Sequence, residues 1–98
     1  MLELLIASVQ KKIMLNVNAR KLLSDARKVS VSCDSSKHLV YVIPSNDNYS
    51  YSVVRQNSNC SICAYGLVNE FNIKTKVPYE AISYKNGFCF TYEENTIK

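Results

Sequence analysis

The chain has 98 residues and a formal net charge of +4, with 47% hydrophobic and 20% charged residues. This length fits one small domain, and the composition is that of a globular chain, which excludes a disordered or low-complexity protein. The apolar run LLIASV is far too short to span a bilayer and lacks the basic flank of a signal peptide. We therefore expect one domain over residues 1–98, no membrane segment, and a reducing compartment in which cysteines are thiols or metal ligands.

The positive charge is concentrated in the first 28 residues. Six basic residues lie there against Glu3 and Asp25, whereas the rest of the chain carries six basic and six acidic residues. A basic segment of this kind can contact nucleic acid or an acidic partner, or it can be a solvated helix face. The candidate contact residues are Lys11, Lys12, Arg20, Lys21, Arg27 and Lys28.

Apolar residues at helical spacing predict that residues 1–28 form a basic helical segment. A second helical piece would begin after Asn18, whose side-chain oxygen can cap it. The residues that recur at the spacing of an amphipathic helix are Leu2, Leu5, Ile6, Val9 and Ile13.

From Val29 the apolar spacing changes to two, which predicts a sheet-rich core over residues 29–92. We expect strands over 29–32, 39–43 and 49–53, joined as an antiparallel meander through turn-rich stretches. The loops would be 34–37, which begins at Asp34, and 45–48, which follows Pro44.

The second part of the chain is less clearly patterned. Residues 64–72 fit a strand or a helix, and a short helix should begin at Tyr79, after Pro78. Asn86-Gly87 predicts a hairpin turn that joins 82–85 to 88–92, and residues 93–98 resemble a frayed tail. The expected fold class is α+β, with the helical segment packed on a small antiparallel sheet that ends in a hairpin.

Two of the four cysteines, Cys60 and Cys63, have the C-x-x-C spacing of a zinc knuckle. No second pair exists at matching spacing, and the remaining soft ligands, Cys33, His38 and Cys89, are scattered. The pair can therefore be ordinary buried thiols, half of a zinc site, or a disulfide or redox pair.

Catalytic constellations are not evident. A cysteine nucleophile needs a base, and His38 is the only histidine. Neither a convincing carboxylate pair nor a glycine-rich phosphate loop is present, so we do not expect an enzyme. The seven tyrosines are either strand-core residues or rings that stack on single-stranded bases.

The order of these pieces resembles a known family. A basic segment leads into a strand pair, a Y-x-V strand follows, then a cysteine pair, and then a proline before an apolar segment. In this order the chain resembles the SWIM zinc-finger domain, whose motif is C-x-C, a variable gap and C-x-H, and most of all the small SWIM-domain subunit of Shu complexes. The stretches that carry the resemblance are ARKLLSDARKVSVSCDSSKHLVYVIPS (19–45), YSYSVVRQNSNCSICAYG (49–66) and KVPYEAISY (76–84).

The chain departs from that motif at the metal ligands. Cys60 matches the first cysteine, but the pair ending at Cys63 is C-x-x-C, and the second half of the motif falls on Tyr79 and Ala81. Alanine has no donor and neutral tyrosine is a poor zinc ligand, so the resemblance implies a degenerate SWIM-like ββα core without its metal. Alternatively, Cys60 and Cys63 recruit Cys89 or His38 to a rebuilt zinc site.

The resemblance implies a nuclear, non-enzymatic subunit that acts in homologous recombination, in DNA repair or meiosis. Such a subunit pairs with a RecA-fold recombinase paralogue and promotes assembly of the recombinase filament on single-stranded DNA. The alternative is a standalone nucleic-acid-binding module that uses the basic N-terminal helices, with binding that weakens steeply as salt rises. A third reading is a small thiol-redox protein that uses Cys60 and Cys63, with a depressed thiol pKa at one of them.

Overall fold

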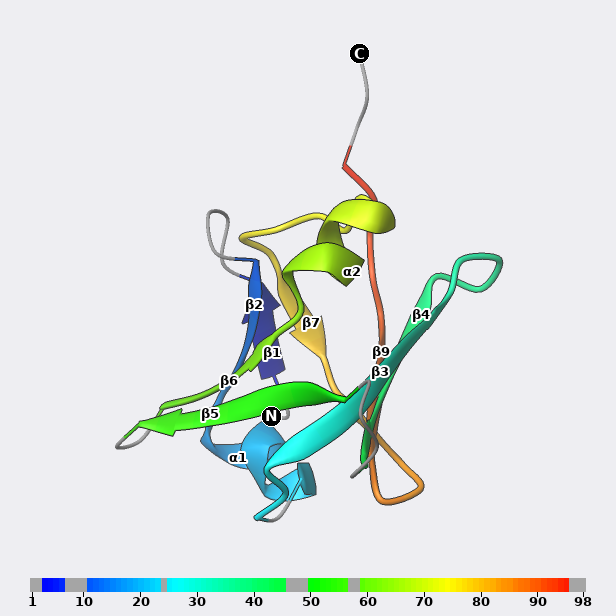
Figure 1. Cartoon of the computed structure of the whole chain (residues 1–98). Coiled ribbons are helices and arrows are strands. Elements are labelled where there is room, and N and C mark those ends of the chain that lie inside the picture. The colour runs from blue at the N-terminus through cyan, green and yellow to red at the C-terminus, as the bar shows by residue number, and fades with distance from the viewer. Residues whose placement is uncertain (1–2, 7–10, 24, 46–49, 57–58, 96–98) are drawn as a thin grey trace.

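The computed structural model describes residues 3–6, 11–23, 25–45, 50–56 and 59–95, which form one antiparallel sheet of nine strands and three short helical pieces (Figure 1). None of the described helices is long and apolar enough to cross a membrane. The elements are β1 (Glu3–Ile6), β2 (Lys12–Leu15), α1 (Val17–Arg20), the 3₁₀ turn η1 (Lys21–Leu23), β3 (Lys28–Asp34), β4 (Leu39–Pro44), β5 (Tyr51–Gln56), β6 (Asn59–Cys63), α2 (Tyr65–Glu70), β7 (Pro78–Glu80), β8 (Ile82–Tyr84) and β9 (Gly87–Thr91).

The sheet closes on itself through one chain segment. Its strand order is β7-β1-β2-β6-β5-β3-β4-β9-β8, and the two strands at the ends of this order, β7 and β8, are separated only by Ala81. Residues 78–84 therefore form one extended segment, which pairs with β1 through its first half and with β9 through its second half. The result is a nearly closed barrel.

A second strand, β5, also belongs to both halves of the barrel. Tyr51 and Ser52 pair with β3, whereas residues 53–56 pair with β6. A strand that changes partner along its length makes a corner between two sheet layers. We call β7, β1, β2, β6 and the end of β5 the first half-sheet, and β3, β4, β9 and β8 the second half-sheet.

Side chains from both half-sheets fill the interior. In the first half-sheet, Leu4, Leu15 and Cys60 lie opposite one another across β1, β2 and β6, and all three are buried. In the second half-sheet, Val40 of β4 pairs with Phe90 of β9, and both are fully buried. The helical pieces add their own buried residues to this core, which are Ala19, Leu23, Leu67 and Val68.

The predicted N-terminal helix is wrong, and with it the α+β fold class. Residues 3–6 and 12–15 form the antiparallel strand pair β1 and β2, in which Ile6 pairs with Ile13 inside the barrel, while Leu5 pairs with Met14 on the outside. Leu2 and Val9 of the predicted helix lie outside the described residues. The protein is mostly antiparallel β instead. Short helices depend on tertiary packing for most of their stability, and here pairing with β6 and β7 satisfies the same backbone groups inside a sheet.

Only one turn of the predicted second helix remains, as α1. Its N-cap is Asn16 and not Asn18, because the Asn16 Oδ1 accepts a hydrogen bond from the Ala19 backbone N–H at 2.8 Å. The Asn16 side chain also accepts from the Glu3 N–H at 3.3 Å, which joins α1 to the start of β1.

The strand predictions for the middle of the chain are confirmed in part. β3 and β4 form the expected pair around a turn in which the Asp34 Oδ1 accepts hydrogen bonds from the Ser36 and Lys37 backbone N–H groups. However, β5 pairs with β3 and not with β4, so the three strands are no meander. Most of the predicted loop 45–48, together with Tyr49, lies outside the described residues.

In the second part of the chain, the sequence left residues 64–72 open between strand and helix. The structure shows that they are mainly helical, because they contain α2. The short helix predicted from Tyr79 is wrong, because this segment forms β7 and β8. The predicted hairpin is confirmed, although its turn lies one residue earlier: Tyr84 pairs with Gly87, and Lys85 takes the positive φ of 51°.

Gly87 offers a direct test of this packing. A Cβ at Gly87 would overlap the carbonyl oxygen of Val42 on β4, so Gly87→Ala should lower the free energy of unfolding by about 3 kcal/mol, the upper end for overpacking. Chemical denaturation measures this change. The matched control is Gly66→Ala in α2, where no atom lies within 4 Å of the added methyl group. The control should be neutral or stabilising by roughly 0.5 kcal/mol, and equal effects of both substitutions would contradict the β4–β9 packing.

Candidate functional site

The two cysteines of the predicted metal half-site lie on opposite faces of β6. Cys60 pairs with Leu15 inside the barrel and is 1% exposed, whereas Cys63 pairs with Lys12 and is exposed. Residues three apart on a strand point in opposite directions, so these thiols do not converge on one ion. Burial raises the pKa of the Cys60 thiol, against the smaller opposing effect of Arg55.

The other two positions of the SWIM-like motif, Tyr79 and Ala81, are core residues of the closing segment. The Tyr79 hydroxyl donates to the Lys74 carbonyl oxygen at 2.6 Å, and its ring centroid lies 5.4 Å from that of Phe90. Burial raises the pKa of Tyr79. Among the described residues no cluster of three or more His, Cys, Asp or Glu side chains is placed to hold a metal, and zinc binding stays a prediction without a site in that part of the chain.

The six predicted basic contact residues fall into two groups. Lys11 and Lys12 lie where β2 begins, whereas Arg20, Lys21, Arg27 and Lys28 follow its other end, in α1, in η1 and at the start of β3. Arg55, which the sequence did not single out, joins the second group, because its Nη2 donates to the Ala26 carbonyl oxygen at 3.1 Å. The structure therefore provides no single basic helical face.

His38, Tyr92 and Cys33 do not form a catalytic arrangement. His38 contacts the Tyr92 ring at 5.2 Å between centroids, and its Nε2 lies 3.4 Å from the Glu94 Oε1. Burial raises the pKa of both the Tyr92 hydroxyl and the Cys33 thiol. A nucleophilic cysteine needs a lowered pKa, so Cys33 and Cys60 are poorly suited to thiolate chemistry.

Tyrosines come together on the outer surface of the second half-sheet. Tyr41 of β4 and Tyr84 of β8 place their ring centroids 5.1 Å apart, although β9 runs between the two strands. Tyr41 pairs with Cys89 of β9 and Tyr84 pairs with Gly87 of β9, so the two tyrosines are diagonal neighbours across this strand.

We call this surface the aromatic face. Its residues point away from the buried Val40, Val42, Phe88 and Phe90, because neighbours along a strand alternate between faces. Ile82 is the most exposed of them, at 53%. The aromatic face consists of Leu39, Tyr41, Ile43, Ile82 and Tyr84, with the buried Cys89 between Tyr41 and Ile82.

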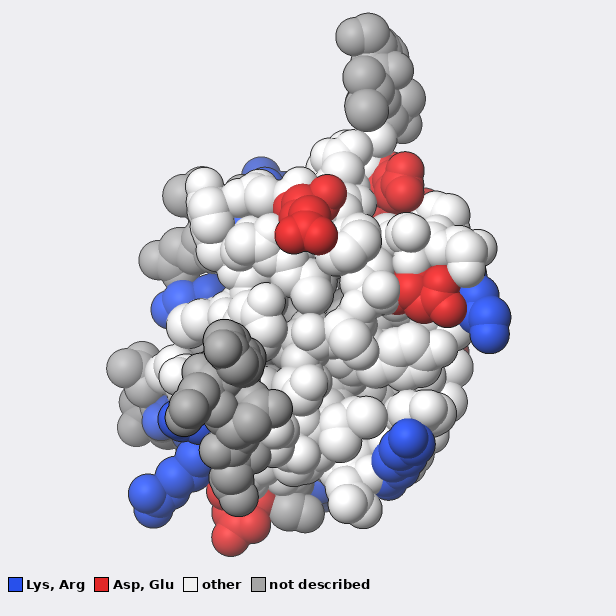
Figure 2. Space-filling model, turned by 45° about the vertical axis from the view of Figure 1, so that its right-hand side comes forward, with Lys and Arg blue, Asp and Glu red and all other residues white. Residues whose placement is uncertain are grey.

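The aromatic face is uncharged at its centre and charged at its rim. The Lys85 Nζ lies 5.4 Å from the Tyr84 ring centroid, and Lys28 is exposed at the start of β3, on the same side of the strand as Ser30 and Ser32. Asp34 lies at the far end of β3, where its carboxylate accepts a hydrogen bond from the Ser36 hydroxyl in the adjoining turn. This hydrogen bond lowers the pKa of the Asp34 carboxyl group. Figure 2, which brings the β3–β4 side of the barrel forward, shows a mostly uncharged surface with separate charged groups around it.

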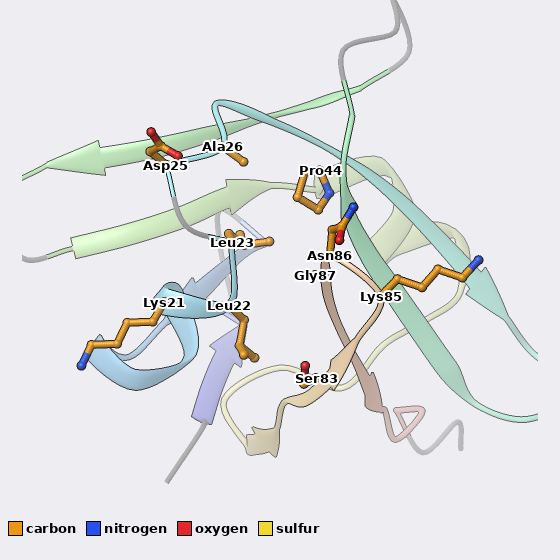
Figure 3. A pocket seen from close by; sticks show the side chains of 10 residues that line it. All are labelled: Lys21, Leu22, Leu23, Asp25, Ala26, Pro44, Ser83, Lys85, Asn86 and Gly87. Atoms are coloured by element: carbon orange, nitrogen blue, oxygen red, sulfur yellow. The ribbon is translucent and has the colours of Figure 1, made fainter.

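An open groove of about 550 Å³ adjoins the aromatic face, between η1 and the β8–β9 turn (Figure 3). Lys85 belongs to both surfaces, and the Ser83 and Asn86 side chains supply hydrogen-bonding groups. The lining residues are Lys21, Leu22, Leu23, Asp25, Ala26, Pro44, Ser83, Lys85, Asn86 and Gly87.

Sequence reasoning did not identify Tyr41 and Tyr84 as a pair. The Asn86-Gly87 hairpin signal was available, and it places Tyr84 close to a residue without a side chain. What the pattern did not supply was the pairing of β9 with β4, which brings Tyr41 to the same place.

The placement of the cysteines predicts their reactivity. In the native protein a thiol reagent such as DTNB should modify Cys63 rapidly and leave Cys60 unmodified until the chain unfolds, because only Cys63 is exposed. Mass spectrometry of the labelled protein distinguishes the two sites, and a Cys63→Ser variant provides the control. Equal protection of both thiols, lost on addition of a chelator, would instead indicate a shared metal.

Comparison with known proteins gave no matching family model, no matching curated protein and no matching solved structure, so the function has to be argued from the surface just described.

Proposed function

We propose that the protein is a small non-enzymatic binding module and that its aromatic face binds single-stranded nucleic acid. The observation that carries this proposal is the pair of outward-facing rings of Tyr41 and Tyr84, 5.1 Å apart, with a lysine ammonium group beside them. Aromatic side chains on a sheet surface stack on unpaired bases, and such stacking tolerates any base because every base has a π-face.

The distribution of charge supports a nucleic-acid ligand. The rings and aliphatic side chains form an uncharged centre for bases, and Lys28 and Lys85 stand at the rim, where phosphates would pass. The net charge of +4 favours the approach of a polyanion in general. A single strand fits better than a duplex, whose bases are stacked on one another and cannot reach the rings.

This proposal retains the alternative function inferred from the sequence, a nucleic-acid-binding module, but assigns the contact to the aromatic face and not to basic N-terminal helices. The basic helices that were to carry it are replaced by the paired strands β1 and β2 and by α1. Of the six predicted basic residues, Lys28 lies at the rim of the aromatic face. The recombination role implied by the SWIM resemblance, with its recombinase partner and nuclear location, stays a prediction. The helix-to-sheet architecture on which the resemblance drew is absent from the described residues, so no observation here favours it.

The two tyrosines can be tested by fluorescence anisotropy with a labelled oligothymidylate of about 12 nucleotides. Tyr41→Ala or Tyr84→Ala should each weaken binding by ~1–3 kcal/mol, which is about 5- to 150-fold in Kd. Tyr41→Phe keeps the ring and serves as the matched control, and it should bind nearly as well as the native chain. Unchanged affinity in both alanine variants would refute the proposal.

The salt dependence of binding tests the role of the rim lysine. Each phosphate contact to single-stranded nucleic acid contributes about −0.7 to the slope of log K against log salt concentration. Lys85→Gln should therefore make that slope shallower by about 0.7 without affecting folding, because the side chain is exposed. Lys76→Gln, at an exposed lysine away from the face, should leave the slope unchanged. The same change in both variants would assign the effect to net charge alone.

A further inference from the structure

The outer surface of the first half-sheet carries a row of mostly apolar side chains. Leu5 of β1 and Met14 of β2 lie directly opposite each other and are 40% and 41% exposed. The exposed Pro78 of β7 is paired with Leu5 and continues the row on one side. On the other side Ser61 of β6 lies opposite Met14, and the half-buried Val54 of β5 ends the row. The solvated side of an antiparallel sheet is usually polar, so this apolar row indicates a surface that another molecule covers.

Charged residues lie on the two sides of the apolar row, and their signs differ. On one side Glu3 of β1 is directly opposite Glu80 of β7, which is an unfavourable pair of like charges. On the other side Lys12 begins β2 and points outward, because the residues of a strand alternate between its two faces. The exposed Lys76 lies on this side too, since its backbone N–H donates to the Ile6 carbonyl oxygen at 3.0 Å. We call the apolar row, together with these four charged residues, the β1–β2 face.

We propose that the β1–β2 face packs against the same face of a second copy of the chain, giving a symmetric dimer. The two-fold axis runs along the apolar row, across the strands, so that Leu5 and Met14 meet the same residues of the other copy. Rotation about this axis reverses the direction along the strands, and it brings the acidic side of one copy over the basic side of the other. Glu3 of each copy then lies near Lys12 of its partner, and every such contact occurs twice.

The order of the charges favours a second copy over other partners. A nucleic acid or a membrane of anionic lipids would meet Glu3 and Glu80 as well as the lysines, so that like charges would face each other. The β1–β2 face requires a partner whose acidic and basic sides run in the opposite order, and a two-fold rotation of the chain itself supplies one. An axis parallel to the strands would instead place the acidic side of one copy over the acidic side of the other.

The size of the β1–β2 face indicates a weak dimer. The face extends over five neighbouring strands, which are β7, β1, β2, β6 and β5. Adjacent strands are about 4.8 Å apart, so the apolar row is only about 19 Å long. Interfaces at the low end of the size range are weak or transient, and we expect a micromolar Kd.

The dimer does not depend on the proposed nucleic-acid binding, and it can form whether or not that proposal holds. Figure 1 shows β1 and β2 on the other side of the barrel from β3 and β4. Tyr41 of β4 therefore lies away from the dimer interface.

Sedimentation velocity from low micromolar to near millimolar concentrations tests the dimer. The native chain should pass from monomer to dimer mass as the concentration rises. Met14→Lys should raise the dimer Kd about tenfold or more, because two like charges then face each other across the axis. Met14 is exposed, so the variant should fold normally by circular dichroism. Met14→Leu keeps the apolar contact and should dimerise like the native chain, and Thr91→Lys, which adds the same charge at an exposed position of β9, should have little effect.

Charge reversal tests the direction of the axis. Glu3→Lys alone, or Lys12→Glu alone, should raise the dimer Kd about threefold or more, because a pair of like charges then replaces a pair of opposite charges at two symmetric places. The double variant Glu3→Lys/Lys12→Glu exchanges the two signs and should recover most of the native affinity. A native chain that stays monomeric at every concentration, a dimer insensitive to Met14→Lys, or a double variant that dimerises no better than the single ones would each overturn the proposal.

Discussion

The structure depends on the pairing of one segment, residues 78–84, with both ends of the same sheet. Its first half completes the ladder of β1 and its second half completes that of β9, with the buried Ala81 at the corner between them. Closure of this kind satisfies backbone groups that an open sheet would leave exposed. Tyr79 strengthens the same segment, because its hydroxyl bonds to the Lys74 carbonyl oxygen and accepts from the Glu93 N–H.

Closure of the barrel also decides which side chains are available for function. Cys60, Tyr79 and Ala81, which a SWIM-like motif would direct at a metal, face the interior and help to fill it. The same packing requires Gly87 to lie against the Val42 carbonyl, and the pairing of β9 with both β4 and β8 brings Tyr41 and Tyr84 together on the outer surface. The aromatic face is therefore a direct consequence of how β9 fits between β4 and β8.

The residue pattern predicted the secondary structure correctly where a strand was long enough to show its alternation or where a turn had a specific sequence signal. The alternation from Val29 to Ile43 predicted β3 and β4, and Asn86-Gly87 predicted the β8–β9 hairpin. The N-terminal segment failed because Leu5, Ile6 and Ile13 fit a helical period, whereas the alternation of the actual strands is limited to two buried residues in each, Leu4 and Ile6 in β1 and Ile13 and Leu15 in β2. The segment after Pro78 failed similarly, since its three-residue strands are too short to show a period.

By itself the sequence determined the positive charge of these 98 residues, the central strand pair and the last hairpin. These follow from composition and from contacts between neighbours in the chain. Tertiary structure alone decided that β7 and β8 close a barrel, that Cys60 and Cys63 face opposite ways, and that Tyr41 meets Tyr84. Those outcomes depend on pairing between strands far apart in sequence, where the register of one strand sets which face every side chain occupies.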